Sequence, residues 1–448
     1  PYFRHPDAKQ ERSSGFLKPD FKTSTDTGTT FWIPYYFALG RDKELTLTPI
    51  LSTSERYLLR KQYKQVFKYG EVSLDSSGGY INDDKIQLVP KLNPDDMKNK
   101  WGGHLFWKTD WHLTDVWRLK GELECVGQKT YLKRYNISDK DVLKSIAQIE
   151  GFWERDYLTQ SAYGYQGLRT VDNHSVMPRL LPEFGYYMDR DLWCGSLRNT
   201  VYFRHFSRNE GLVHRLASVD GEWSRTEILP LGAKVTLRPG YRADFFDIEL
   251  SRMPDNKALY TGRKTRAYGD VAVIASYPFL AASESSSFVI EPKIGYLGSP
   301  VGLNSDDIPN EDSQNFEFTE TKFFTPNLFS GRSRISGGSR IDYGLWFDGA
   351  VNQRNLISGM VGQIYQFRED NDFPKGSGLD KRFSDVVGRL TFDPTSFYTL
   401  AYRFRADPDS QILKRSETNV TFGPTWLKFG VDHILLRDSD YEKTFHQQ

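Results

Sequence analysis

The residues whose types and spacing point to chemistry are charged side chains at every second position of predicted β-strands. In "GGHLFWKTDWHL", Lys108 and Asp110 share one face of the segment, opposite a face of Leu, Trp and Thr. In "YTLAYRFRAD", Arg403 and Arg405 alternate with Tyr, Leu and Phe in the same way. Cationic side chains on such a face attract anionic groups. The candidate residues of this face are Lys108, Asp110, Arg118, Arg389, Arg403 and Arg405.

Other signals of chemistry are sparse. The chain has no GxSxG, Walker A, HExxH or GxGxxG motif. Its eight His are scattered, and His104 and His112 on the polar face fit the lining of a pore better than a set of ligands. The acidic run "NEDS" offers Glu311 and Asp312 to a hard cation, although a solvated loop is the favoured interpretation. We therefore expect no enzyme, no cofactor and no metal site.

Composition favours an outer-membrane barrel. The 448 residues carry 59 Lys and Arg against 58 Asp and Glu, which argues against a nucleic-acid partner. Only 38% of the residues are hydrophobic, yet 15% are aromatic, and the mean hydropathy is -0.58. Strands that are apolar on one face only, with aromatic girdles at both interfaces, give this combination. No run reaches the roughly 18 apolar residues of a transmembrane helix.

Alternation of apolar and polar residues recurs along the chain at the spacing of β-hairpins. It is also clear in "SFVIEPKIGYL" and "RIDYGLWFDGAV". A soluble sandwich alternates too, but about 18 to 20 such strands exceed the roughly seven to nine of one sandwich. We predict an all-β fold, a large antiparallel transmembrane β-barrel of the bacterial outer membrane that is incomplete in this chain.

Polar segments predict long loops at one end of this barrel. They cover residues 83–100, 251–266, 298–315 and 368–382. Short turns such as residues 393–396 belong to the other end, as in outer-membrane barrels generally. Residues 138–150 fit either a short helix or a loop.

The stretch "FWIPYYFALGRDKELTLTPI" predicts a hairpin with one proline in each strand. A turn centred on its "RD" pair places the two prolines directly opposite each other, or slightly out of line if the turn is one residue longer. Proline has no backbone N–H, so the pair predicts a weak point in the ladder. An edge strand or aromatic girdle that tolerates proline would explain the same pattern. The candidate residues here are Pro34, Pro49, Trp32, Tyr35 and Tyr36.

Several stretches resemble the LptD family, the lipopolysaccharide-assembly proteins of the Gram-negative outer membrane. They include "RSSGFLKPDF", "PYYFALGRDKELTLTPILSTSER", "VIEPKIGYLGSP" and "IPNEDSQNFEFTETKFFTPNLFSGRSRISGGSRIDYGL". The resemblance covers most of the chain in a consistent order. It implies that lipopolysaccharide passes through the barrel and leaves by a lateral gate near the first strands, with Pro34 and Pro49 at the gate.

The resemblance also implies partners and boundaries. The partners would be lipopolysaccharide, outer-membrane lipid, an LptE-type lipoprotein plug and a periplasmic lipopolysaccharide-bridge protein. Residues 1–22 would link a missing periplasmic jellyroll to a barrel at 23–448, whose last strands we expect to be missing. The family's disulfides do not transfer to Cys125 and Cys194, and a bridge between these two cysteines is the less favoured interpretation. A general porin or TonB-dependent transporter is the alternative, although the latter needs an N-terminal plug domain.

Overall fold

The computed structural model contains mainly β-strands. It describes residues 12–24, 27–53, 57–80, 101–251, 260–313, 317–352, 354–368, 372–395 and 397–437. These residues hold 24 strands of one sheet, the short helix α1 (Tyr131–Arg134) and two 3-10 helices, η3 (Pro230–Gly232) and η4 (Glu320–Lys322). Across these ranges, no helix combines the length and the apolar character that crossing a bilayer requires. The all-β prediction is confirmed.

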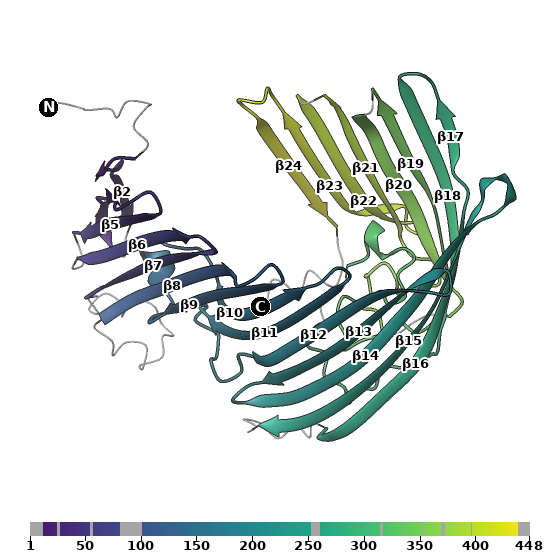
Figure 1. Cartoon of the computed structure of the whole chain (residues 1–448), viewed down its shortest axis with the longest axis horizontal. Helices are drawn as coiled ribbons and strands as arrows, with labels where there is room; N and C mark the ends of the chain where they lie inside the picture. The colour runs from purple at the N-terminus through teal and green to yellow at the C-terminus, as the bar shows by residue number, and fades with distance from the viewer. Residues whose placement is uncertain are drawn as a thin grey trace. The chain divides into compact units, whose positions relative to one another are not determined.

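The chain divides into two compact units, each described by itself. Strands of the first unit are β1 (Gly15–Phe16), β2 (Asp20–Ser24), β3 (Gly28–Trp32), β4 (Tyr35–Ala38), β5 (Lys43–Ser52), β6 (Leu58–Phe67), β7 (Gly70–Tyr80), β8 (Trp101–His112), β9 (Trp117–Val126), β10 (Val142–Phe152) and β11 (Asp156–Gly167). From β4 to β11 each strand pairs antiparallel with the next along the chain, as neighbouring arrows in Figure 1 show.

The strands β12 (Arg179–Leu192), β13 (Gly195–Ser207), β14 (Gly211–Ile228) and β15 (Lys234–Ser251) contain residues of both units, and β16 (Gly262–Ser276) does so by its first residue alone. The second unit continues with β16, β17 (Phe279–Ala282), β18 (Ser286–Ser299), β19 (Gly338–Val351), β20 (Arg354–Gln366), β21 (Val386–Thr395), β22 (Tyr398–Asp407), β23 (Ile412–Phe422) and β24 (Phe429–Leu436). From β18 to β24 every strand again pairs antiparallel with its successor.

The strand count exceeds the predicted 18 to 20 partly because some strands are interrupted. β1 pairs with β4 and β2 with β3, so these four pieces make two broken strands. β16 and β17 both pair with β18 and make a third. A proline lies in each gap, at Pro19, Pro34 and Pro278, where the ladder loses a donor.

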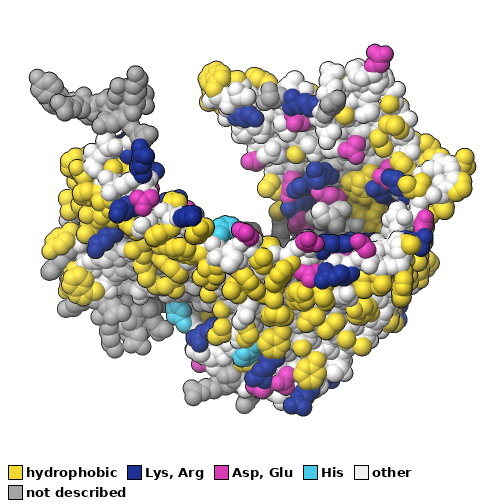
Figure 2. Space-filling view, viewed as in Figure 1, with side chains coloured by type: hydrophobic (Ala, Val, Ile, Leu, Met, Phe, Trp, Pro, Cys, Tyr) yellow, Lys and Arg dark blue, Asp and Glu magenta, His cyan; other side chains and the backbone are white. Residues whose placement is uncertain are grey.

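The sheet has an apolar face and a polar face. On β15, Leu237, Tyr241 and Phe245 are exposed, whereas Arg242 and Asp244 on the opposite face are buried. Figure 2 shows hydrophobic side chains over strands β14 to β16, and Lys, Arg, Asp and Glu on the viewed face of β20 to β23. This division is the one that a strand between lipid and a polar lumen requires.

Two long connections cover the polar face of the second unit. The β18–β19 connection (residues 300–337) supplies Phe318, Phe323, Leu328 and Phe329 to a hydrophobic core. The β20–β21 connection (residues 367–385) adds Phe373 and Leu379, and the strands add Met360, Ile364 and Val387. The first connection is longer than the predicted loop at 298–315. Both leave the same end of the sheet because two strands separate them, and the short turns lie at the other end.

Helix α1 forms the centre of a second core, in the first unit. Tyr131 and Leu132 of the helix and the following Tyr135 are fully buried against β5, β6, β9 and β10. Residues from Val142 onward form strand β10, so the predicted helix or loop at 138–150 is wrong over most of its length. Burial raises the pKa of the Tyr135 phenol to about 12.

The remaining loop predictions differ in detail. Residues 262–266 belong to β16 and not to a loop. β21 continues to Thr395, so the short turn begins later than predicted. Residues 83–100 and 252–259, like residues 1–11 of the predicted linker, lie outside the described residues.

Candidate anion-binding site and proline seam

Four arginines lie together on the polar face of β21, β22 and β23. Arg389 pairs directly across strands with Arg403, and Arg405 with Arg415. Direct partners share a face, and residues two apart on one strand do so as well. Opposed like charges destabilise a sheet, so two such pairs side by side require compensation by anions. Sequence alternation predicted Arg389, Arg403 and Arg405, and it missed Arg415.

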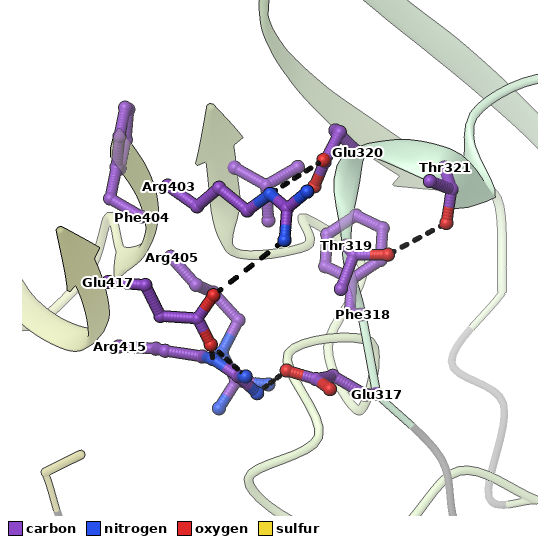
Figure 3. A pocket seen from close by; sticks show the side chains of 11 residues that line it. Glu317, Phe318, Thr319, Glu320, Thr321, Arg403, Phe404, Arg405, Arg415 and Glu417 are labelled. Atoms are coloured by element: carbon purple, nitrogen blue, oxygen red, sulfur yellow. Dashed lines mark hydrogen bonds and ion pairs between the residues drawn. The ribbon is translucent and has the colours of Figure 1, made fainter. Parts of the chain in front are cut away.

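Carboxylates of the β18–β19 connection compensate two of these arginines. Arg403 lies 3.3 Å from Glu320 and 3.9 Å from Glu417 of β23. Arg415 forms ion pairs with Glu417 and with Glu317. Figure 3 shows Glu317 and Glu320 projecting from the connection toward the arginines across a small cavity. The cavity has a volume of about 160 Å³. Burial of the neighbouring Lys322 lowers its pKa.

Arg389 is the exception within this group. Its side chain is exposed, and it makes no hydrogen bond or ion pair among the residues that the structure describes. Arg405 has a different environment, since it lies 3.5 Å from Asp385 and donates a hydrogen bond of 2.9 Å to the Ser377 carbonyl. Burial raises the pKa of Asp385, although Arg405 opposes this shift. Arg405 thus anchors the β20–β21 connection.

Strand arginines anchor the β18–β19 connection in the same manner. Arg242 and Arg266 both donate to the Arg332 carbonyl, each at 2.9 Å, and both contact the fully buried carboxylate of Asp244. Arg340 donates to the Thr325 carbonyl, and Arg238 to the Phe324 carbonyl. Guanidinium groups of the wall therefore bind main-chain oxygens of the connection. Sequence patterns could not indicate this role, because carbonyl partners leave no residue signature.

Asp312 serves the same connection and does not line a cation site. Its two carboxylate oxygens accept hydrogen bonds from the backbone N–H groups of Arg332 (2.9 Å) and Ser333 (3.0 Å). Arg332 in turn forms an ion pair with Asp220 of β14. The described residues contain no group of three or more His, Cys, Asp or Glu arranged to hold a metal. The favoured interpretation of "NEDS" as a solvated loop is also incomplete, since Asp312 folds the turn at 331–333.

The polar residues of the first unit form a separate group. Lys108 pairs with Glu122, and Arg118 donates to Asp110 at 2.7 Å. Lys108 and Asp110 line a cavity of about 380 Å³. These three candidates are therefore close together, but each cation already has a carboxylate partner.

His104 is buried and does not line a pore. Its Nδ1 lies 2.6 Å from the Ser77 hydroxyl, its Nε2 lies 3.3 Å from Asp75, and the Ser77 hydroxyl lies 2.7 Å from the Tyr131 hydroxyl of helix α1. A Ser–His–Asp set is typical of hydrolases. Here Ser77 is 8% exposed and His104 4%, so a substrate has no access to the hydroxyl. The network instead fastens α1 to β7 and β8.

The two hairpin prolines lie one residue out of line. Tyr36 pairs with Thr46 and Trp32 with Ile50, so Pro49 lies opposite Ile33, and Pro34 lies opposite Thr48. The predicted direct opposition is wrong because the turn has an odd number of residues centred on Arg41. The alternative of a slightly shifted pair, from a different turn length, describes the register.

This register places the two missing donors in different seams. Ile33 donates to the Pro49 carbonyl at 3.2 Å, and Leu17 donates to the Pro34 carbonyl at 2.9 Å. Such pairs normally exchange two hydrogen bonds, and proline cannot supply the second. Pro49 therefore weakens the seam between β3–β4 and β5, whereas Pro34 weakens the seam between β3–β4 and the β1–β2 strand. Between β1 and β2 the register also shifts by one residue.

The three aromatic candidates point to different surroundings. Trp32 packs on the inner core beside helix α1. The Tyr35 ring lies 4.9 Å from Phe16 and 4.6 Å from Phe37, and the Tyr36 hydroxyl donates to Glu44 at 3.0 Å. Strand β3–β4 has neighbours on both sides, so the alternative of an edge strand does not describe it.

Comparison with known protein families identifies the family of this chain. The family model of LptD, described as LPS transport system D, matches residues 98–448. The chain belongs to the LptD family. Membership confirms the predicted outer-membrane location and the fold class, an incomplete antiparallel β-barrel.

Individual relatives agree with this assignment. The LPS-assembly protein LptD of Hahella chejuensis is 26% identical over 444 residues, which cover 94% of this chain and 54% of that protein. LptD of Bordetella avium is 24% identical, with 95% and 59% covered. The chain thus spans about half the length of the curated LptD relatives it matches. Among solved structures, OmpT of Vibrio cholerae matches with a TM-score of 0.29 and 8% identity over 75% of this chain and 94% of that chain, too low to carry an argument.

Proposed function

We propose that this chain forms the membrane-spanning part of a lipopolysaccharide exporter and releases its cargo sideways along strand β3–β4. The name LPS-assembly protein, which the LptD relatives carry, supports this cargo. On this proposal residues 1–22 lead from a periplasmic jellyroll and the barrel begins at residue 23. The partners are a periplasmic lipopolysaccharide-bridge protein and an LptE-type lipoprotein plug. No enzymatic step is involved.

The observation that carries the proposal is that strand β3–β4 is weakened toward both neighbours at one height. Each missing donor removes a hydrogen bond with a net contribution of about 0.5 to 1.5 kcal/mol in water, and an unpaired backbone group costs several in hydrocarbon. A seam with fewer bonds to lose therefore opens at a lower cost. Trp32 and Tyr36 border the opening on one face of the strand, and Tyr35 borders it on the other.

A second proline seam in the same chain serves as an internal comparison. Tyr277 donates to the Pro292 carbonyl at 3.2 Å, and Pro278 lies in the gap between β16 and β17, which repeats the arrangement of Ile33, Pro49 and Pro34. The partner β18, however, is a continuous strand. Among the described strands, β3–β4 is an interrupted strand that also pairs with a second interrupted strand, β1–β2, so we propose the exit there.

The test replaces both prolines of one seam by alanine in the full-length protein. We expect Pro34→Ala with Pro49→Ala to reduce surface lipopolysaccharide and raise envelope permeability to bulky antibiotics. The matched control, Pro278→Ala with Pro292→Ala, should leave both unchanged. Equal effects of the two double variants, or no effect of the first, would contradict an exit at β3–β4.

A further inference from the structure

The four arginines on β21 to β23 lie closer together than contact with water alone requires of charged side chains on a strand. Two cross-strand pairs of like charge, Arg389 with Arg403 and Arg405 with Arg415, cost stability in an isolated sheet. Arg405 is accounted for by its contacts to the β20–β21 connection. Arg403 and Arg415 line the cavity of Figure 3, and Arg389, the cross-strand partner of Arg403, makes no ion pair among the described residues.

The anions that reach this group come from a connection and not from the wall alone. Glu417 belongs to β23, but Glu317 and Glu320 belong to the β18–β19 connection. In the pair of Arg403 with Glu320 the side chains are 55% and 12% exposed, and in the pair of Arg415 with Glu317 they are 33% and 44% exposed, so each pair keeps one member in contact with solvent. Exposed ion pairs contribute only about 0 to 1 kcal/mol each. Both pairs can therefore exchange with a stronger anionic ligand.

A phosphate group is such a ligand. It carries up to two charges and several acceptor oxygens, which guanidinium groups on neighbouring strands can bind in bidentate fashion. We propose that Arg389, Arg403 and Arg415 bind a phosphate group of the cargo, and that the carboxylates of Glu317 and Glu320 occupy the site until that phosphate displaces them. This inference rests on the proposed function for the identity of the cargo. The binding chemistry itself is independent of it.

Displacement has a structural consequence. Glu317 and Glu320 flank Phe318, which is 2% exposed in the core of the connection. Phe318 and the contacts of Arg242, Arg266 and Arg340 hold the backbone of the connection, so only the side chains of Glu317 and Glu320 have to move. The site thus combines arginines that are fixed on the strands with two carboxylates that a ligand can displace.

The experiment measures binding to the purified full-length protein in detergent micelles. The probes are inorganic pyrophosphate, lipopolysaccharide, and the same lipopolysaccharide after enzymatic dephosphorylation. We expect Arg389→Ala with Arg403→Ala to weaken lipopolysaccharide binding about tenfold, and Glu317→Gln with Glu320→Gln to strengthen it by a similar factor. Dephosphorylated lipopolysaccharide should bind all variants equally. Binding of pyrophosphate with the same rank order identifies the phosphate as the recognised group, whereas a rank order seen only with lipopolysaccharide assigns the remainder to its sugar and acyl parts and overturns the phosphate site.

Controls separate this proposal from misfolding and from the transport hypothesis. Arg354→Ala removes an exposed arginine paired with Asp393 at 2.9 Å near the other end of the sheet and should change nothing. Arg403→Lys retains the charge and the fold but loses the bidentate geometry, so intermediate binding is expected. If Glu317→Gln with Glu320→Gln leaves affinity unchanged or lowers it, the carboxylates are only structural and the proposal is wrong. The binding assay does not involve transport, so its outcome does not depend on whether lipopolysaccharide leaves along β3–β4.

Discussion

At the scale of single residues, the environment of an arginine decides what its loss costs. Arg405 and Asp385 are 14% and 11% exposed, whereas Arg354 and Asp393 are 45% and 42% exposed. Removing one partner of a buried ion pair leaves the other charge buried without compensation. We expect Arg405→Ala to lower the free energy of unfolding by about 3 kcal/mol. Arg354→Ala should lower it by less than about 1 kcal/mol. Urea-induced unfolding in micelles measures both, and equal losses would contradict the anchoring role of Arg405.

Gly331 provides a second test at this scale. A Cβ at Gly331 would collide with the carboxyl group and the backbone oxygen of Asp312, which folds the turn at 331–333. Gly331→Ala should therefore cost about 1 to 3 kcal/mol and expose the turn to proteolysis. The control is Gly430→Ala on β24, where a Cβ meets no atom within 4 Å. Equal protection of the two variants from protease would show that Asp312 can move aside at no cost.

At the scale of elements, the gap in β3–β4 makes a specific prediction about one amide. Pro49→Ala supplies an N–H opposite the Ile33 carbonyl, and the new amide should be protected from hydrogen exchange. Replacing proline by alanine also raises the conformational entropy of the unfolded chain, which lowers the free energy of unfolding by about 0.4 to 1 kcal/mol. Global stability is therefore a poor measure of the new hydrogen bond. Hydrogen exchange at position 49 of this variant measures the new bond directly. Rapid exchange there would mean that the seam is open for reasons other than the proline.

Strand positions were predictable from the sequence because their signal is local. Period-two alternation placed Arg389, Arg403 and Arg405 on one face, and pairing confirms that they share it. Arg415 was missed although Arg415 and Glu417, two residues apart in "ILKRSETNV", share one face of the strand. Register was not predictable, since one residue more or fewer in the turn around Arg41 changes every partner. The proximity of Glu317 and Glu320 to these arginines could not be predicted, because it depends on contacts between residues far apart in the sequence.

At the scale of the whole molecule, loop length sets the orientation in the membrane. The long β20–β21 connection lies at one end of the second unit, and the short turn between β17 and β18 lies at the other. Outer-membrane barrels place long loops outside the cell. In a background with Cys125→Ser and Cys194→Ser, Lys375→Cys should react with an impermeant maleimide on intact cells. Glu284→Cys should react only after the membrane is permeabilised, and the reverse pattern would invert the assigned topology.

The anchoring of the connections by carbonyl oxygens has one more consequence. Arg242, Arg266, Arg340 and Arg405 bind the main chain, which every residue type supplies, whereas side chains such as Asp312, Asn304 and Asn327 fold the first connection itself. The surface-facing positions of a connection can therefore change their side chains while its attachment points remain. Sequence change at such positions leaves the arginines that hold the connection, and the strands that carry them, unaltered.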